Sequence, residues 1–312
     1  MMHIALAFDN NYLIPAYALL ASIFKHNPKA IFTFHVVLQG IDEQEQQQLR
    51  DYICKHNGSR LYCYTLDDRL LSTLPMMSPW NWSAMPYVKM FFPLLLSEKV
   101  DRLLVLDVDM LVVNGLDELY NWDLGDHPLG AVKDSGISCC NAYWDLHLRE
   151  DYFNSGMMLI DVERWNKLKI SEQAIAFARD NPDKIYYVDQ DALNAAVAGR
   201  HLLLPEKYNL IHAYIPQSAS RQFYDEFLKG QTILHFTFPK PWHYLSTHPY
   251  RHLYRHYLKM SPKKGARVIT DFSIAKLPAY IYIKLLEWYL STPVLVKFWR
   301  TLKMKMKKGL AN

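Results

Sequence analysis

The chain has 312 residues, half of them hydrophobic and 14% aromatic, a composition that supports a large buried core and excludes global disorder. Its formal net charge of +4, with histidine neutral, is too small to indicate a nucleic-acid-binding protein. The four cysteines form neither a C-x-x-C pair nor a cluster with zinc spacing, so we expect reduced thiols.

The sequence predicts neither a signal peptide nor a membrane-spanning helix. Residues 1–9 lack a basic region and are typical of a strand. A spanning helix requires a run of about 18 apolar residues, and the sequence contains none. We therefore expect a cytoplasmic protein that uses a soluble donor or acts at the inner face of the cytoplasmic membrane.

The first third of the chain alternates predicted strands and helices. Strands are expected at residues 3–8, 31–38 and 60–65, and amphipathic helices at residues 12–26 and 41–56. This order predicts an α/β fold with a mostly parallel sheet and helices on its faces.

The alternation continues after a loop-rich connection at residues 66–86. Helices are expected at residues 87–96 and 189–198, and strands at residues 102–106, 110–113, 129–132, 153–160 and 232–236. The long segment 134–152 predicts a lid or binding loop. The alternation stops near residue 250, so we expect a catalytic domain at 1–250 and a helical region at 251–312.

Two carboxylates, Asp107 and Asp109, directly follow a predicted strand. Ligands of open α/β sheets lie at the carboxyl ends of strands, and side chains at positions i and i+2 of extended backbone face the same way. Both carboxylates could therefore reach one divalent cation that also holds a diphosphate. Taken alone, the short D-x-D string is explained equally well as the cap of a strand.

Three further motifs carry chemistry only in combination. A predicted strand delivers His235, and Lys240 follows five residues later, which suits a metal and a phosphate; singly, His235 is better explained as a structural histidine. Asp189 begins the D-Q-D string at a predicted helix start, where it could simply be the N-cap. Gly156 follows Asn-Ser and would let the backbone approach a ligand closely.

Taken together and in this order, the motifs resemble glycosyltransferase family 8, and within it the bacterial lipopolysaccharide or lipooligosaccharide α-galactosyltransferases and α-glucosyltransferases. The matching strings lie at residues 7–12, 106–109, 153–156, 189–191 and 235–242. The resemblance implies a GT-A fold, with a Rossmann-like mixed and mostly parallel sheet. It also implies a UDP-sugar donor, a glycolipid acceptor, manganese (or magnesium in its place) and retention of the anomeric configuration. The choice between galactose and glucose stays open.

The resemblance also implies roles for individual residues. The uridine-binding stretch matches Ala7, Asp9, Asn11 and Tyr12. The metal ligands match Asp107, Asp109 and His235, and Asp107 also matches a donor-binding residue. The diphosphate-binding lysine matches Lys240. The residues around the donor sugar match Asn154, Ser155, Gly156, Asp189 and Gln190, and an aspartate between sugar and acceptor matches Asp134.

This sequence departs from the family pattern at two places. Lys89 stands where the family has a donor-binding arginine, which keeps the charge and loses the bidentate geometry. Phe238-Pro239 replaces a glycine in the loop between His235 and Lys240. Because the amide of Gln190 is a poor nucleophile, we favour attack on the same face of the sugar, with Gln190 stabilising positive charge; Asp191 as a covalent nucleophile is the weaker alternative.

The C-terminal segment differs from the rest in charge. Residues 297–308 contain six basic side chains and no acidic one, and the aromatic residues of segment 278–290 suit a bilayer interface. Leu295, Phe298, Trp299, Leu302 and Met306 share one side of a predicted helix. This pattern predicts association with the anionic inner membrane surface and no binding of nucleic acid; a helix packed on the catalytic domain is the alternative.

Two other functions remain open at this point. A nucleotidylyltransferase also combines an α/β sheet with paired carboxylates, but it normally has a glycine-rich phosphate loop after the first strand. Here that place holds Phe8-Asp9-Asn10-Asn11. A non-catalytic membrane scaffold is the second alternative, against which stand the metal-binding and phosphate-binding residue types.

Overall fold

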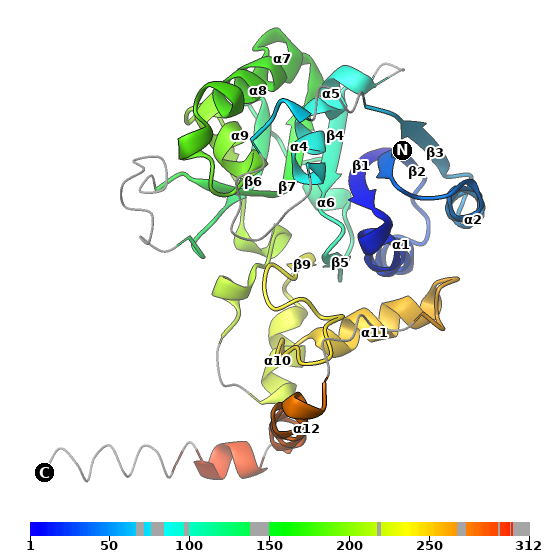
Figure 1. Ribbon diagram of the computed structural model, residues 1–312, viewed down its shortest axis with the longest axis vertical. Helices are drawn as coiled ribbons and strands as arrows, with labels where there is room; N and C mark the ends of the chain where they lie inside the picture. Colours follow the sequence, from blue (N-terminus) through cyan, green and yellow to red (C-terminus); the bar gives the residue numbers. More distant parts are fainter. Residues whose placement is uncertain are drawn as a thin grey trace, which may run out of the picture.

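The computed structural model describes residues 1–66, 72–75, 84–96, 100–137, 150–216, 220–266, 273–292, 294–299 and 301. A seven-stranded sheet with the order β3-β2-β1-β4-β7-β6-β8 forms its centre (Figure 1). Its strands are β1 (Met2–Asp9), β2 (Phe32–Gln39), β3 (Arg60–Tyr64), β4 (Arg102–Leu106), β6 (Leu129–Lys133), β7 (Phe153–Asp161) and β8 (Leu202–Leu203). Strands β3, β2, β1 and β4 run parallel, and β7 runs antiparallel to β4 and β6. The expected mixed, mostly parallel sheet is confirmed.

Helices cover both faces of this sheet. On one face lie α1 (Leu13–His26) and α2 (Glu43–Cys54), and on the other lie α7 (Val162–Lys167), α8 (Ile170–Asp180) and α9 (Asp189–Val197) (Figure 1). Alternate residues of a strand point to opposite faces. Ile4 and Leu6 of β1 therefore join the core with α1 and α2, whereas Ala5 joins the core with α7, α8 and α9.

The helix expected at residues 87–96 is broken into three short pieces. They are α4 (Met85–Val88), the 3-10 turn η2 (Lys89–Phe91) and α5 (Phe92–Leu95). Pro93 lies in the first turn of α5, and proline cannot donate the backbone hydrogen bond that a continuous helix needs. The break leaves Lys89 buried, with 6% of its surface exposed, beneath the end of the sheet.

A second, two-stranded sheet joins segments that are far apart in the sequence. Strand β5 (Met110–Val112) pairs antiparallel with β9 (Ile233–His235), and Met110 lies opposite His235. The D-x-D string is the turn between β4 and β5. The Phe236 amide donates to the carbonyl of Asp109 at 2.9 Å, so this pairing carries the D-x-D turn to the histidine.

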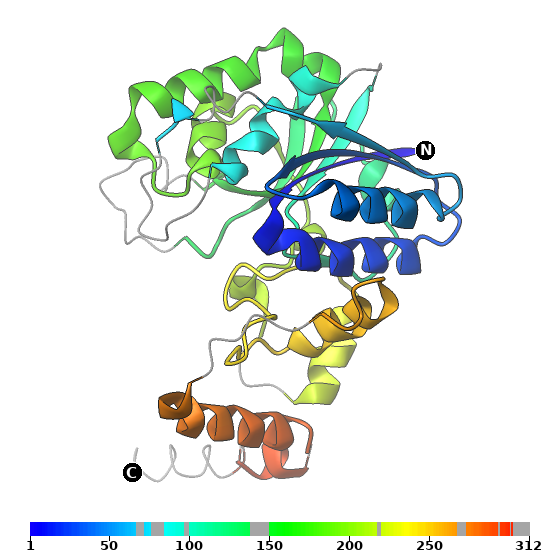
Figure 2. The same cartoon turned by 45° about the vertical axis from the view of Figure 1, so that its right-hand side comes forward.

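The C-terminal helices lie below the main sheet (Figure 2). Helix α10 (Arg221–Leu228) precedes α11 (Arg251–Met260), and Tyr254, Tyr257 and Leu258 of α11 enter the same core as α1. Helix α12 (Leu277–Leu290) lies farther from the sheet. The expected division at residue 250 stays a prediction, and α11 packs with the residues before that boundary. Among the described helices, none is long and apolar enough to cross a membrane.

Ser22 fixes β5 against α1, which gives a prediction about stability. Its buried hydroxyl accepts from the amide of Val112 at 2.9 Å and donates to the carbonyl of Leu19 at 2.6 Å. Ser22→Ala should lower the free energy of unfolding, measured by urea denaturation, by about 1–3 kcal/mol because a buried N–H loses its acceptor. The exposed Ser273 caps nothing with its side chain, and Ser273→Ala should change stability by less than about 0.5 kcal/mol. Equal effects of the two substitutions would contradict this account of β5.

Candidate active site

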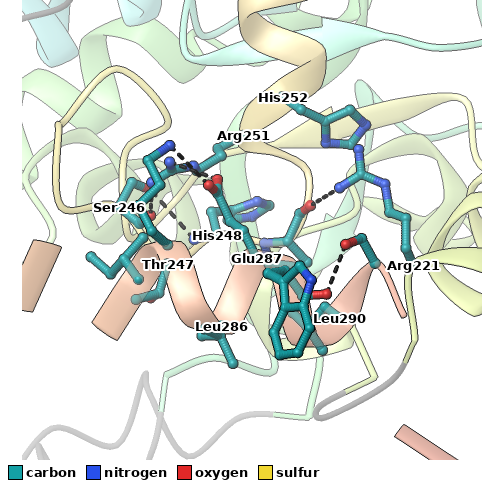
Figure 3. Close-up of a pocket in the computed structure, with 14 residues that line it drawn as sticks. Arg221, Ser246, Thr247, His248, Arg251, His252, Leu286, Glu287 and Leu290 are labelled. Atoms are coloured by element: carbon teal, nitrogen blue, oxygen red, sulfur yellow. Dashed lines mark hydrogen bonds and ion pairs between the residues drawn. The ribbon is translucent and has the colours of Figure 1, made fainter. Parts of the chain in front are cut away.

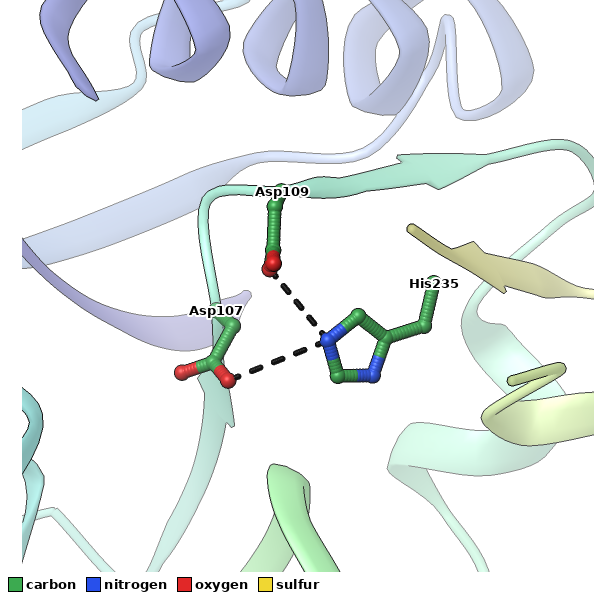
Figure 4. Close-up of side chains that lie close together, drawn as sticks. All are labelled: Asp107, Asp109 and His235. Carbon is green, nitrogen blue, oxygen red and sulfur yellow. Dashed lines mark ion pairs between the residues drawn. The ribbon is translucent and has the colours of Figure 1, made fainter. Parts of the chain in front are cut away.

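Asp107, Asp109 and His235 converge on one point (Figure 4). One ligand atom of each lies within 4.8 Å of the others. His235 Nε2 is 3.3 Å from Asp109 Oδ1 and 3.9 Å from Asp107 Oδ2. The structure therefore brings together the three side chains that the sequence predicted as metal ligands, although β9 is far from the D-x-D turn along the chain.

Each of the two carboxylates binds a different lysine through one oxygen, and its other oxygen faces His235. Lys89 Nζ lies 2.6 Å from Asp107 Oδ1, and Lys240 Nζ pairs with Asp109 Oδ2. Burial disfavours ionisation of Asp109, but the ammonium of Lys240 outweighs burial and holds the pKa of this carboxyl below its ordinary value.

The hydrogen bonds around His235 decide which of its nitrogens is free. The amide of Asn209 donates to Asn154 Oδ1 at 2.9 Å, so its own oxygen accepts from His235 Nδ1, also at 2.9 Å. The proton of the neutral ring thus lies on Nδ1, and the lone pair of Nε2 faces the two carboxylates. Asp109 Oδ1 is buried and has no hydrogen-bond partner in the described part of the chain. Three electron-rich atoms pointing at one place fit a divalent cation, and a histidine held by its second nitrogen is the usual arrangement for a metal ligand.

Gly156 makes room for this cluster. A Cβ added at Gly156 would lie 2.4 Å from His235 Cε1, 2.8 Å from Asp107 Oδ2 and 2.9 Å from Asn154 Oδ1. The carbonyl of Gly156 also accepts from the Asp107 amide at 2.8 Å, so β7 approaches the D-x-D turn directly. The glycine is required for space rather than for a special backbone angle.

Lys89 connects the D-x-D turn to α9. Its ammonium contacts Asp107 at 2.6 Å and Asp189 at 3.2 Å. Burial would lower the pKa of Lys89, but the two carboxylates outweigh burial and raise it, so the side chain stays charged. Asp189 also accepts from the Ser155 hydroxyl at 2.7 Å, and its side chain makes no N-cap bond to α9. The alternative explanation of Asp189 as a helix cap is therefore not supported.

Gln190 lies in a network with Asp134 on the open side of the site. Its oxygen accepts from the Ser155 amide at 3.1 Å, and its nitrogen donates to Asp134 Oδ2 at 3.1 Å. Asn154 donates to the same Asp134 oxygen at 2.9 Å. These contacts fix the orientation of the Gln190 amide. Residues 138–149, which make up most of the expected loop 134–152, lie outside the described residues.

Asp191 has a structural role, because its carboxylate is used in buried hydrogen bonds. It is fully buried and accepts from the Tyr152 hydroxyl at 2.6 Å and from the amides of Tyr186 and Tyr187 at 2.7 and 2.6 Å. A carboxylate enclosed by such donors is a weak nucleophile and cannot approach a sugar without losing them. The geometry therefore disfavours Asp191 as the covalent nucleophile.

The predicted uridine-binding stretch lies at the end of β1. Asp9 caps the 3-10 turn η1 (Asn10–Tyr12) by accepting from the amides of Asn11 and Tyr12 at 2.9 and 3.3 Å. The ring of Tyr12 packs edge-on against Trp242, with centroids 5.6 Å apart. Burial, followed by the charges of Asp109 and Asp107, raises the pKa of Tyr12. Ala7 is half-buried in β1 just before this turn.

Sequence reasoning missed two side chains of the site. Asn209 orients His235, and Tyr152 bonds to Asp191 and accepts from Gln190 at 3.3 Å. Neither belongs to a motif with recognisable spacing. The one available signal was that Tyr152 directly precedes the strand that carries Asn154 and Gly156.

The sheet and the site together have the architecture of a GT-A glycosyltransferase. A model of Glycosyl transferase family 8 matches residues 3–246, and the chain belongs to this family. Lipopolysaccharide 1,2-glucosyltransferase of Escherichia coli is 28% identical over 269 residues, which cover 81% of this chain and 77% of the relative. Lipopolysaccharide 1,3-galactosyltransferase of Salmonella typhimurium is 27% identical, with 79% of this chain and 74% of the relative covered.

Two further proteins are similar to this chain. General stress protein A of Bacillus subtilis is 28% identical over 269 residues, which cover 83% of this chain and 93% of the relative. Among solved structures, the galactosyltransferase LgtC in complex with donor and acceptor sugar analogues superposes with a TM-score of 0.72 at 22% identity. The match covers 89% of this chain and 100% of that chain, and it supports the fold.

Gly156→Ala tests the packing of the cluster. The new methyl group would displace the His235 ring and Asp107 together, because it overlaps both. We expect glycosyl transfer to fall by about 10²-fold, as an ångström of misplacement costs in other enzymes, and manganese binding measured by calorimetry to weaken. Gly265→Ala is the matched control, since an added Cβ there meets nothing within 4 Å. Unchanged manganese affinity in Gly156→Ala would show that the cluster does not bind the ion.

Proposed function

We propose that the protein is a retaining, manganese-dependent hexosyltransferase that moves galactose or glucose from a UDP-sugar to a lipopolysaccharide or lipooligosaccharide acceptor. The observation that carries the proposal is the cluster of Asp107, Asp109 and His235 with a lysine on each carboxylate, in a chain of family 8. The printed names of two relatives, a glucosyltransferase and a galactosyltransferase of lipopolysaccharide, support the substrate class.

The proposed donor lies along the carboxyl ends of β1 and β4. Ala7, Asp9, Asn11 and Tyr12 would surround the uridine, because they lie at the end of β1 and in the turn that follows it. Lys240 would hold the diphosphate, since its ammonium lies against Asp109 and is fixed by the carbonyl of Phe236 at 2.9 Å. The donor sugar would lie among Lys89, Asn154, Ser155, Gly156, Asp189 and Gln190, with Asp134 toward the acceptor.

The chain's own residues provide most of the proposed catalysis. A manganese or magnesium ion bound by Asp107, Asp109 and His235 would supply Lewis-acid stabilisation of the leaving diphosphate. Lys240 adds a second positive charge next to the same group. Lys89 offsets one of the two negative charges of Asp107 and Asp189, which reduces their repulsion of the diphosphate.

Retention of configuration follows from the placement of Gln190. As the sugar loses its diphosphate, positive charge develops at the anomeric carbon, and the fixed Gln190 amide oxygen is available to stabilise it. Because Asp191 is enclosed by donors, we propose attack of the acceptor on the same face that the diphosphate leaves. The departing phosphate oxygen then takes the proton of the acceptor hydroxyl, so no separate general base is needed.

The C-terminal helices are proposed to hold the protein at the inner surface of the cytoplasmic membrane. Leu277, Ile281, Leu285 and Trp288 of α12 are 44%, 50%, 58% and 62% exposed. They recur at helical spacing and form one apolar face. The basic run at residues 297–308, most of which lies outside the described residues, would add attraction for anionic lipids.

The donor and the metal can be tested in one experiment. Incubation with UDP-glucose or UDP-galactose and manganese should release UDP, and EDTA should stop the release. Asp109→Ala should abolish UDP release, because a site that lacks one of its three ligands holds the ion poorly. Asp126→Ala, at a fully exposed position, should retain UDP release. Pyrophosphate exchange in place of UDP release would indicate a nucleotidylyltransferase, and inactivity with every nucleotide sugar would indicate a scaffold.

Gln190→Ala distinguishes charge stabilisation from nucleophilic attack. Loss of one preorganised dipole should reduce turnover by about 10²–10³-fold while the product keeps its anomeric configuration, read from the anomeric proton coupling by NMR. Gln47→Ala, on the exposed face of α2, is the control and should have full activity. A glycosyl adduct trapped on Gln190 would contradict the proposal, and an adduct on Asp191 would replace it with double displacement.

A further inference from the structure

A cavity of about 510 Å³ lies between α12 and residues 246–249, which precede α11 (Figure 3). Its inner wall includes Ser246, His248 and Arg251, its side includes Arg221 of α10, and its outer wall includes Lys284 and Trp288 of α12. None of these residues belongs to the proposed donor or metal site. The cavity therefore needs its own explanation.

Positive charge exceeds negative charge in this cavity. Arg221, Arg251 and Lys284 line it, and Glu287 is the one carboxylate among the described lining residues. Arg221 also pairs with Asp225 of its own helix at 3.4 Å, so three cations are matched by two carboxylates. Glu287 is shared, since it lies 2.6 Å from Arg251 and 3.1 Å from Lys284. Arg251 is only 4% exposed, and a cation so deeply buried is normally matched by as much negative charge as it carries.

The cavity opens next to the apolar face of α12. Trp288 lines the cavity and is also 62% exposed, so it belongs to both surfaces. Ile283 and Glu287 of the same helix turn inward, while Ile281 and Leu285 turn outward. A ligand that fills the cavity with an anionic group can therefore lay apolar chains along the outer face of α12. An anionic phospholipid has this combination of parts.

We propose that this cavity binds the phosphate of an anionic membrane phospholipid, whose acyl chains lie beside the exposed face of α12. The proposal rests on the membrane association that we propose above and assigns a headgroup site to it. Arg221, Arg251 and Lys284 would hold the phosphate oxygens. Charge-assisted bonds of this kind are the strongest hydrogen bonds a phosphate can make.

Such a site would set the position of the active site relative to the membrane. His248 packs against Phe236, with ring centroids 4.7 Å apart, and Phe236 directly follows the His235 of the metal-type cluster. The rings of His248 and Phe236 would thus lie between a lipid headgroup in the cavity and the end of β9. A glycolipid acceptor held in the same leaflet would then meet the active site at a constant height.

The test uses the full chain and vesicles of two compositions, phosphatidylcholine alone and phosphatidylcholine mixed with phosphatidylglycerol. The double variant Arg221→Gln/Lys284→Gln should lose at least about tenfold of its affinity for the anionic vesicles in a sedimentation assay, because two charge-assisted contacts are removed. The control Lys259→Gln/Lys276→Gln removes two exposed cations outside the cavity and should lose much less. Equal losses in both pairs would overturn the cavity as a specific site.

A further variant separates the possible failures. Ile281→Ser/Leu285→Ser should abolish binding to both kinds of vesicle; if it does not, membrane association through α12 is wrong, whatever the cavity binds. Stabilisation against heat by inorganic phosphate alone, as large as that by anionic vesicles, would overturn the lipid in favour of a free phosphate.

Discussion

The structure depends on holding two carboxylates and the lone pair of a histidine against one another. Asp107, Asp109 and His235 would repel if nothing else were present, and burial increases that repulsion because the interior screens charge poorly. Two lysines make the arrangement possible. Each takes one oxygen of one carboxylate and leaves the other oxygen free, so the negative charge that faces His235 is sufficient for a cation and is not in large excess.

Every nearby element keeps this unfavourable cluster in position. The pairing of β5 with β9 places His235 beside the D-x-D turn, and Ser22 ties β5 to α1. Gly156 leaves the space that the ring and the carboxylate occupy. Asn154 accepts from Gly156 and Asn209 and donates to Asp134, so one amide links the metal-type cluster to Asp134. Such a web of short contacts is what preorganisation requires, since its members cannot relax when a ligand binds.

The sequence allowed the sheet and the cluster to be predicted because both rest on local patterns. Apolar runs with period two give strands, and a carboxylate pair after a strand gives a site at its carboxyl end. The role of Asn209 could not be predicted, since it acts through a contact with His235 that only the folded chain creates. The break at Pro93 and the packing of α11 on α1 were missed for a related reason: tertiary contacts decide where a helix stops and which core it joins.

Lys89 shows how a single departure from a family pattern can be absorbed by its surroundings. An arginine would present a planar fork to two acceptors, whereas the lysine ammonium must serve Asp107 and Asp189 as a point charge. The carbonyl of Ser155 also lies 3.5 Å from the ammonium, and the Ser155 hydroxyl binds Asp189, so Ser155 helps to fix both the lysine and Asp189. The charge balance of the proposed cation site and the shape of the proposed sugar pocket are therefore joined at one buried side chain. A substitution that alters either of them will be felt by the other.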